Sequence, residues 1–167
     1  SKIELSGLLN FSGGTLTSSS TSNLELQNES SLNSSAQFTV PSLDLNGQKL
    51  SLNSATTHLV ISSPFTAGDN ESVDTKVGSL TFNGTATLEN EAAIESSSGA
   101  LTFNGNVSLD NSSILLTGGS ALFNSAAQIS SGELKLYDSS LTLAAGVSMT
   151  NSSKLGLRNT NFAGSSK

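Results

Sequence analysis

The sequence predicts an all-β fold, a right-handed parallel β-helix of about eight coils with a roughly triangular cross-section. Two observations predict it. One is a heptapeptide that returns at a period of about 20–21 residues, and the other is a series of apolar residues paired at positions i and i+2. Periods of this length are typical of stacked repeats, whose single units are too short to bury a core alone. Each unit is therefore expected to form one coil of a solenoid.

The heptapeptide occurs three times, as Gly78–Gly84 (GSLTFNG), Gly99–Gly105 (GALTFNG) and Gly119–Ser125 (GSALFNS). Equivalent residues of stacked coils lie above one another, so three columns are expected. They are an internal aromatic stack, an asparagine ladder joined by amide hydrogen bonds, and a glycine corner without room for a side chain. Asparagine also tolerates left-handed turn conformations. The members are Phe82, Phe103 and Phe123; Asn83, Asn104 and Asn124; and Gly78, Gly99 and Gly119.

The apolar pairs predict short strands, because residues i and i+2 of a strand share one face. Three pairs complete each turn of the chain. The clearest pairs are Leu80/Phe82, Ala86/Leu88, Ala92/Ile94, Leu101/Phe103, Val107/Leu109, Ile114/Leu116, Ala121/Phe123, Ala127/Ile129 and Leu134/Leu136. Such pairs do not share a helical face, and Ser, Thr, Asn and Gly crowd every candidate helix. An antiparallel meander also suits short strands with Asn-Gly turns, but the constant repeat favours the solenoid. Parallel crossovers are right-handed as a rule.

Residues 64–78 break the pattern. They lack regular alternation and contain three acidic residues within six positions. We interpret this segment as an excursion loop that projects from the rod, with an inert connector as the alternative. Because loops carry function more often than regular elements do, Asp69, Asn70, Glu71 and Asp74 are the candidate binding residues.

Composition limits the possible partners. The net charge is −6, and the chain has one arginine and six scattered lysines, so no basic stripe is available for phosphates. Nucleic acid and anionic membranes are therefore not expected partners. No run approaches the ~20 apolar residues that span a bilayer, so direct membrane insertion of this segment is not expected. The chain has no cysteine, which excludes disulfides and thiolate metal sites.

An enzymatic site is not predicted, and neither is a metal or a cofactor. Some β-helices are polysaccharide lyases or hydrolases, which need clustered acids with a base or two apposed carboxylates. Glu89 and Asp110 are one repeat apart and are expected to be stacked neighbours, with Glu91 close by. An active site would require these acids to converge with Lys76 or Lys135 in a groove.

A single histidine is the remaining candidate for acid–base or metal chemistry. His58 has no Cys, Asp or Glu near it in the sequence, and one imidazole makes neither a serine triad nor a zinc site. It is expected to be a surface or turn residue.

The acidic, cysteine-free, Ser/Thr/Asn/Gly-rich composition and the coils of about 20 residues resemble the passenger domain of bacterial autotransporters, the type V secretion systems. The resemblance covers nearly all of residues 1–167. More distantly, Gly118-Gly119-Ser120-Ala121 and the repeated Phe-Asn resemble the GGA-(I/L/V) and FxxN motifs of the chlamydial polymorphic membrane proteins. In this chain the asparagine follows the phenylalanine directly.

The resemblance implies that residues 1–167 are a single β-helix segment of a longer passenger, with an outer-membrane β-barrel elsewhere in the full protein. It also implies export to the bacterial cell surface and a non-catalytic role as adhesin or stalk. The implied partner is a host-cell surface protein or glycan, or another copy in cell–cell contact. The alternatives are a carbohydrate-active enzyme fragment and a structural fibre module of the tail-spike or surface-layer type.

Overall fold

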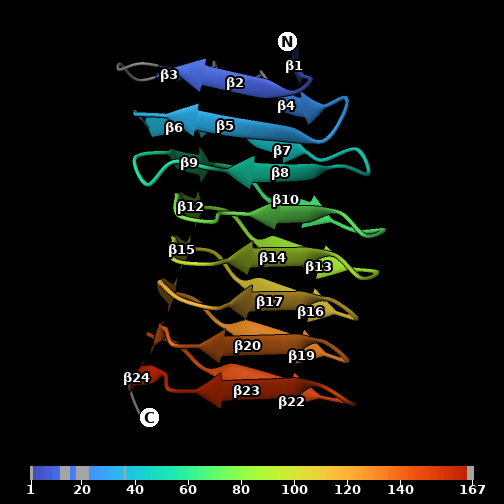
Figure 1. Cartoon of the computed structure of the whole chain (residues 1–167). Coiled ribbons are helices and arrows are strands. Elements are labelled where there is room, and N and C mark those ends of the chain that lie inside the picture. The colour runs from blue at the N-terminus through green and yellow to red at the C-terminus, as the bar shows by residue number, and fades with distance from the viewer. Residues whose placement is uncertain (1, 12–15, 18–22, 36, 165–167) are drawn as a thin grey trace.

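The computed structural model describes residues 2–11, 16–17, 23–35 and 37–164, which form a rod of stacked parallel strands (Figure 1). Sheet 1 faces the viewer in Figure 1. Its strands, in stacking order, are β2 (Leu8–Phe11), β5 (Ser30–Ser34), β8 (Lys49–Leu52), β11 (Ser72–Asp74), β14 (Ala93–Ser96), β17 (Ser113–Leu116), β20 (Glu133–Tyr137) and β23 (Lys154–Arg158).

Sheet 2 lies on the left in Figure 1 and also has eight strands in the described residues. They are β3 (Leu16–Thr17), β6 (Gln37–Val40), β9 (His58–Ile61), β12 (Ser79–Phe82), β15 (Ala100–Phe103), β18 (Ser120–Phe123), β21 (Ser140–Leu143) and β24 (Asn161–Gly164).

Sheet 3 forms the third side of the cross-section of the rod and is divided into two parts. The first part contains β1 (Lys2–Leu5), β4 (Asn23–Leu26) and β7 (Ser42–Asp44). The second contains β10 (Phe65–Ala67), β13 (Ala86–Glu89), β16 (Val107–Asp110), β19 (Ala127–Ser130) and β22 (Val147–Thr150). The division lies between β7 and β10. Both strands directly follow a proline, Pro41 or Pro64, which has no N–H to donate to a neighbouring strand.

Apart from the break between β7 and β10, successive strands of each sheet pair in parallel with their equivalents in the next coil, as expected for a parallel β-helix. Ser79 pairs with Ala100 and Ala100 with Ser120, so the strands stack at the predicted repeat. The number of residues per coil is slightly larger near the N-terminus, where Leu8 pairs with Ser31. Eight stacked levels are separated by about seven turns. In Figure 1 the front strands run from right to left as the chain descends, which is the winding of a right-handed coil.

The core is a continuous column inside the three sheets. The predicted inward pairs are buried: Leu80, Phe82, Ala86 and Leu88 have no exposed surface. Burial of apolar surface contributes about 25 cal/mol per Å², so these columns are the main stabilising feature of the rod. Because each pair packs on pairs of the coils above and below, no coil has a complete core of its own.

The phenylalanine column is confirmed. The ring centroids of Phe82 and Phe103 lie 5.1 Å apart with planes 5° from parallel, and those of Phe103 and Phe123 lie 4.7 Å apart. Phe65 extends the column by a tilted contact of 5.1 Å to Phe82. These rings therefore fill one side of the core through four successive coils.

The asparagine ladder is also confirmed. Nδ2 of Asn104 donates to Oδ1 of Asn83 at 2.8 Å, and Nδ2 of Asn124 donates to Oδ1 of Asn104 at 2.7 Å. None of these three described residues has a positive φ. The amide hydrogen bonds, and not left-handed backbone, therefore account for asparagine at this corner.

The glycine corner leaves no room for a side chain, as predicted. A Cβ on Gly99 would overlap the carbonyl oxygen of Gly78, and a Cβ on Gly119 would overlap that of Gly99. Gly119 also has φ +78°, a conformation that glycine adopts without steric cost.

The prediction of an excursion loop at residues 64–78 is wrong. β10 pairs with β13, and β11 pairs with both β8 and β14, so the segment is part of a regular coil. Only Val73 of β11 is inward and apolar, and the next inward position is the fully buried Thr75. The coil therefore lacks an apolar pair there, although its backbone is in register with its neighbours.

Candidate functional site

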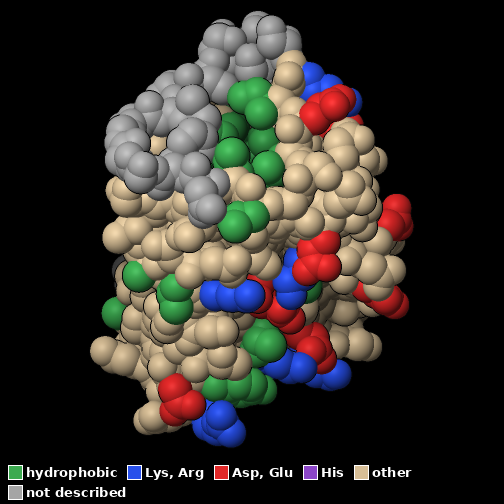
Figure 2. All heavy atoms as spheres, turned by 45° about the horizontal axis from the view of Figure 1, so that its top comes forward, with side chains coloured by type: hydrophobic (Ala, Val, Ile, Leu, Met, Phe, Trp, Pro, Cys, Tyr) green, Lys and Arg blue, Asp and Glu red, His purple; other side chains and the backbone are tan. Residues whose placement is uncertain are grey.

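The outer face of sheet 1 carries charges of both signs (Figure 2). The charged residues of its strands from β8 onwards are Lys49, Asp74, Glu95, Glu133, Lys135, Lys154 and Arg158. Lys49 Nζ lies 3.7 Å from carboxylate oxygens of both Asp74 and Glu95, so one ammonium group links side chains from three coils. The described outward positions of sheet 2 carry no charge apart from the titratable His58.

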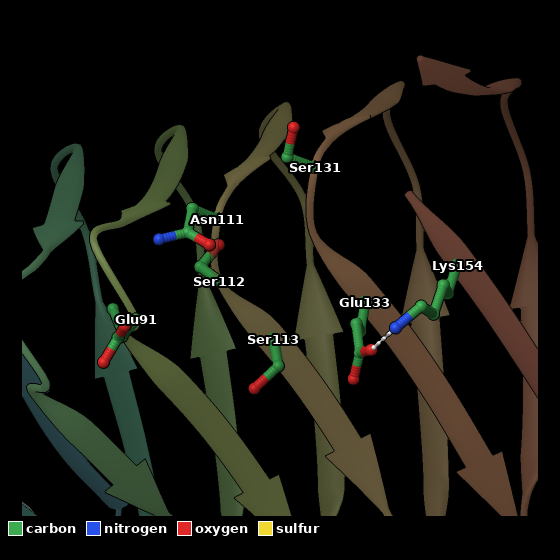
Figure 3. A pocket seen from close by; sticks show the side chains of 8 residues that line it. Glu91, Asn111, Ser112, Ser113, Ser131, Glu133 and Lys154 are labelled. Carbon is green, nitrogen blue, oxygen red and sulfur yellow. Dashed lines mark hydrogen bonds and ion pairs between the residues drawn. The ribbon is translucent and has the colours of Figure 1, made fainter. Parts of the chain in front are cut away.

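A polar groove of about 350 Å³ lies where the corner after sheet 3 enters sheet 1 (Figure 3). Its lining residues recur at nearly one position per coil. They are Glu91 and Ala92; Asn111, Ser112 and Ser113; Ser131 and Glu133; and Lys154. The corner residues Glu91, Asn111 and Ser131 all have positive φ, at the bend where the chain passes from sheet 3 into sheet 1.

An ion-pair cluster forms the downstream wall of this groove. The Glu133 carboxylate accepts hydrogen bonds from Nζ of Lys135 and, at 2.9 Å, from Nζ of Lys154. The hydrogen bond from Lys135, followed by that from Lys154, lowers the pKa of Glu133 to about 2. At neutral pH the wall therefore holds one carboxylate between two ammonium groups, which leaves it one net positive charge.

Asp69 and Asn70, two of the predicted binding residues, form the tight corner between β10 and β11. Both have positive φ, and both side chains are exposed. One coil later, the same corner positions are occupied by Asn90 and Glu91. The two corners are linked by a hydrogen bond in which the N–H of Asn70 donates to the carbonyl of Asn90 at 3.2 Å. Their residue types suit a left-handed turn, which asparagine and aspartate tolerate better than most residues.

Glu71 and Asp74, the other two predicted binding residues, make contacts within the rod. The Glu71 carboxylate accepts the N–H of Gly47 at 2.6 Å and the N–H of Gly68 at 2.9 Å, which joins two successive coils. Asp74 accepts the N–H of Lys76 at 2.9 Å and pairs with Lys49. Two of the three acids in this segment therefore bond groups of the rod itself.

The expected stacking of Glu89 on Asp110 is confirmed, because these residues pair in the register of β13 and β16. They do not line the polar groove, and neither do Lys76 and Lys135. Of the acids considered for hydrolytic chemistry, only Glu91 reaches it. The groove therefore does not bring the carboxylates together with the two lysines named for an active site.

The expected position of His58 was wrong in part. His58 begins strand β9, is half-buried, and its Nε2 lies 3.2 Å from Oγ1 of Thr81 on the next coil. Within the described ranges, no three His, Cys, Asp or Glu side chains are grouped so that they could hold a metal ion. No helix in the same ranges is long and apolar enough to cross a membrane.

The polar groove was not predicted from the sequence. Its lining residues are individually ordinary Ser, Asn and Glu, and the hollow arises from side-chain size across coils. Along one column of sheet 1, the small Ser113 is followed one coil later by Glu133 and then by Lys154, which are both longer. A comparison of residue size down each column of the repeat is the signal that points to it.

Comparison with known proteins found no family model that matches the chain, and no similar curated protein or solved structure.

Proposed function

We propose that this chain is a surface-displayed, non-catalytic β-helical segment of a bacterial autotransporter passenger that acts as an adhesin or stalk in cell contact. The observation that carries the proposal is the stacking of strands over eight levels with shared side-chain columns. A rod of this kind exposes long, flat faces at a distance from its attachment point. The resemblance in composition to autotransporter passengers supports the cellular setting.

The physical chemistry of the chain suits export. It has no cysteine that could be oxidised on the way to the surface. Each coil uses the coil before it as a template, so the rod can form progressively as the chain emerges. The columns of Phe82 and Asn83 show this dependence, since each member has its main contacts in the neighbouring coils.

Sheet 2 offers the more suitable face for adhesion. A column of β-branched and apolar side chains follows its centre, with no acidic residue among them. The column consists of Thr39, Val60, Thr81, Thr102, Leu122 and Thr142. A flat face without charge costs little to desolvate against a protein or glycan, and it lets a second acidic copy approach without direct repulsion. The proposed partner is therefore a host-cell surface protein or glycan, or another copy on a neighbouring cell.

The test is binding of the fluorescently labelled chain to epithelial cells, measured by flow cytometry. The double variant Thr81→Lys/Thr102→Lys places two ammonium groups on sheet 2 and is expected to lower binding by about tenfold. Thr87→Lys/Ser108→Lys adds the same charge to sheet 3 and is the matched control. Equal losses in both variants would move the adhesive surface away from sheet 2, and no saturable binding by the native chain would contradict an adhesive role.

The corner at Asp69 and Asn70 is tested without breaking the coil. Deleting residues 66–77 would remove β11 and most of β10. Any loss of binding would then reflect the disrupted coil and not the missing corner residues. Asp69→Asn with Asn70→Gly instead removes the charge and one side chain, and both new residues tolerate positive φ. Unchanged cell binding in this variant would assign the corner a purely structural role.

A further inference from the structure

We propose that the polar groove binds a neutral oligosaccharide, whose hydroxyl groups bond to Glu91, Asn111 and Ser113. The inference deepens the proposed adhesive function and rests on it: it names a neutral glycan as a ligand class and gives this ligand a site of its own, the groove, apart from the face of sheet 2 proposed for cell contact. The hollow of about 350 Å³ lies within the range typical of small-molecule sites.

The first argument is that three polar side chains of the groove, those of Glu91, Asn111 and Ser113, lack hydrogen-bond partners among the described residues. Two other corner asparagines have paired side-chain amides: Nδ2 of Asn151 donates to Oγ of Ser130 at 2.7 Å, and Nδ2 of Asn159 donates to Oδ1 of Asp138 at 2.8 Å. In the described part of the chain, the side chains of Glu91, Asn111 and Ser113 make no such bond. Figure 3 shows them on two successive coils around a common hollow.

The second argument is the shape of the groove. The floor is made by small side chains, Ala92, Ser112 and Ser113, and Ser112 is held in place by its hydrogen bond of 2.8 Å to the carbonyl of Leu88. The Glu133–Lys154 ion pair rises at one end as a wall. The floor therefore runs along the rod axis over successive coils, with polar groups spaced at ~4.8 Å per coil. That spacing is close to the length of one pyranose unit in a linear chain.

The third argument is chemical complementarity. A carboxylate accepts two hydrogen bonds from a vicinal diol, a carboxamide both donates and accepts, and a hydroxyl does both. Glu133 is already neutralised by Lys135 and Lys154, so it is not free to bind a cationic ligand. Two ammonium groups share the single Glu133 carboxylate, so together with the Glu91 carboxylate the groove and its wall carry no net charge and give a carboxylated or sulfated sugar no electrostatic gain. A neutral, polyhydroxylated ligand satisfies all of these conditions.

The experiment is a titration of the ¹⁵N-labelled chain with three neutral probes, cellotetraose, chitotetraose and mannotetraose, followed by amide chemical shifts. At least one probe is expected to shift the amides of residues 111–113, with a Kd of about 1 mM, because the site has no aromatic platform. Tetragalacturonate is the anionic probe and is expected to cause no shift there. Absence of groove shifts with all three neutral probes, or preferential binding of tetragalacturonate, would overturn the inference.

Variants assign the binding to named groups. Glu91→Gln/Ser113→Ala removes a charge and a hydroxyl from the groove. It is expected to raise the Kd of the probe that binds best by about tenfold. Ser108→Ala on sheet 3, outside the groove, is the matched control for loss of a hydroxyl and should leave the titration unchanged. If both proteins bind the probe equally, the groove is not the site. If the double variant loses the probe but keeps its binding to cells, the adhesive function stands and the groove does not carry it.

Discussion

At the residue scale, the rod is held together by side chains that contact the equivalent side chain of the next coil. The asparagine ladder is the clearest case, since Asn104 donates to Asn83 and accepts from Asn124. Each such exposed hydrogen bond contributes modestly, about 0.5–1.5 kcal/mol. Its direction matters as much as its presence, because only one of the two amide atoms can donate.

That direction predicts unequal effects of one chemical change at two sites. Asn104→Asp removes the donor to Asn83 and is expected to lower the free energy of unfolding by about 1 kcal/mol. Asn83→Asp keeps the acceptor that Asn104 uses and serves as the matched control, with a smaller expected loss. Urea denaturation of both variants measures the difference. Equal losses would show that the added negative charge, and not the missing donor, determines stability at this corner.

The depressed pKa of Glu133 predicts an acid-dependent contribution to stability. A carboxyl group whose pKa falls on folding stabilises the protein above its ordinary value of 4.5, and the contribution is lost as the pH falls from 4.5 to about 2. Glu133→Gln should therefore be less stable than the native chain at pH 6 but nearly equal to it at pH 2. Denaturation at both pH values checks this. A difference that persists unchanged at pH 2 would contradict the low pKa.

At the element scale, each strand contributes two inward side chains, and a defect on one strand is felt by the strands above and below. Phe103 stacks on both Phe82 and Phe123 and is fully buried, whereas its neighbour Thr102 points outward. Adjacent positions of one strand thus differ in how much stability is lost when the side chain is replaced by a charged one.

A carboxylate on the inner side of β15 is therefore expected to cost far more stability than the same group on the outer side. Phe103→Asp removes two ring contacts and buries a carboxylate, which should cost more than the about 3–5 kcal/mol of a Phe→Ala change. Thr102→Asp places the same group on the outer face and should cost less than about 1 kcal/mol. Circular dichroism with thermal and urea unfolding measures both. Comparable destabilisation by the two substitutions would contradict the inward orientation of the column.

The elements that could be predicted are those in which equivalent positions recur at the constant spacing of the repeat. The column of Phe82 and the register of Glu89 with Asp110 follow from spacing alone, since equal periods place equal positions in contact. The coil at residues 64–78 could not be predicted, because the buried Thr75 interrupts its apolar pattern. Its Glu71 bonds Gly47 of the preceding coil, a contact that no local pattern reveals.

At the whole-molecule scale, stability is a sum of coil–coil interfaces, and within residues 2–164 the last described coil packs on one neighbour where an internal coil packs on two. The described C-terminal end shows this plainly. Leu155 and Phe162 are 47% and 52% exposed, whereas their counterparts one coil earlier, Leu134 and Leu141, are each 1% exposed. An open hollow of about 240 Å³, lined by apolar side chains, lies at this end.

This difference in burial predicts that protection of the backbone amides against hydrogen exchange varies along the rod. Strands β22, β23 and β24 are expected to exchange their amide hydrogens fastest among the strands from β12 onwards, and β15 and β18, which lie between complete coils, slowest. Phe162→Ala removes little buried surface and should leave the exchange of β15 unchanged, whereas Phe103→Ala should accelerate exchange in β12, β15 and β18 together. Hydrogen exchange read by mass spectrometry distinguishes the cases. Uniform exchange along the chain, with both variants acting on every strand alike, would mean that the rod unfolds as one cooperative body and that its coils are not the units of stability.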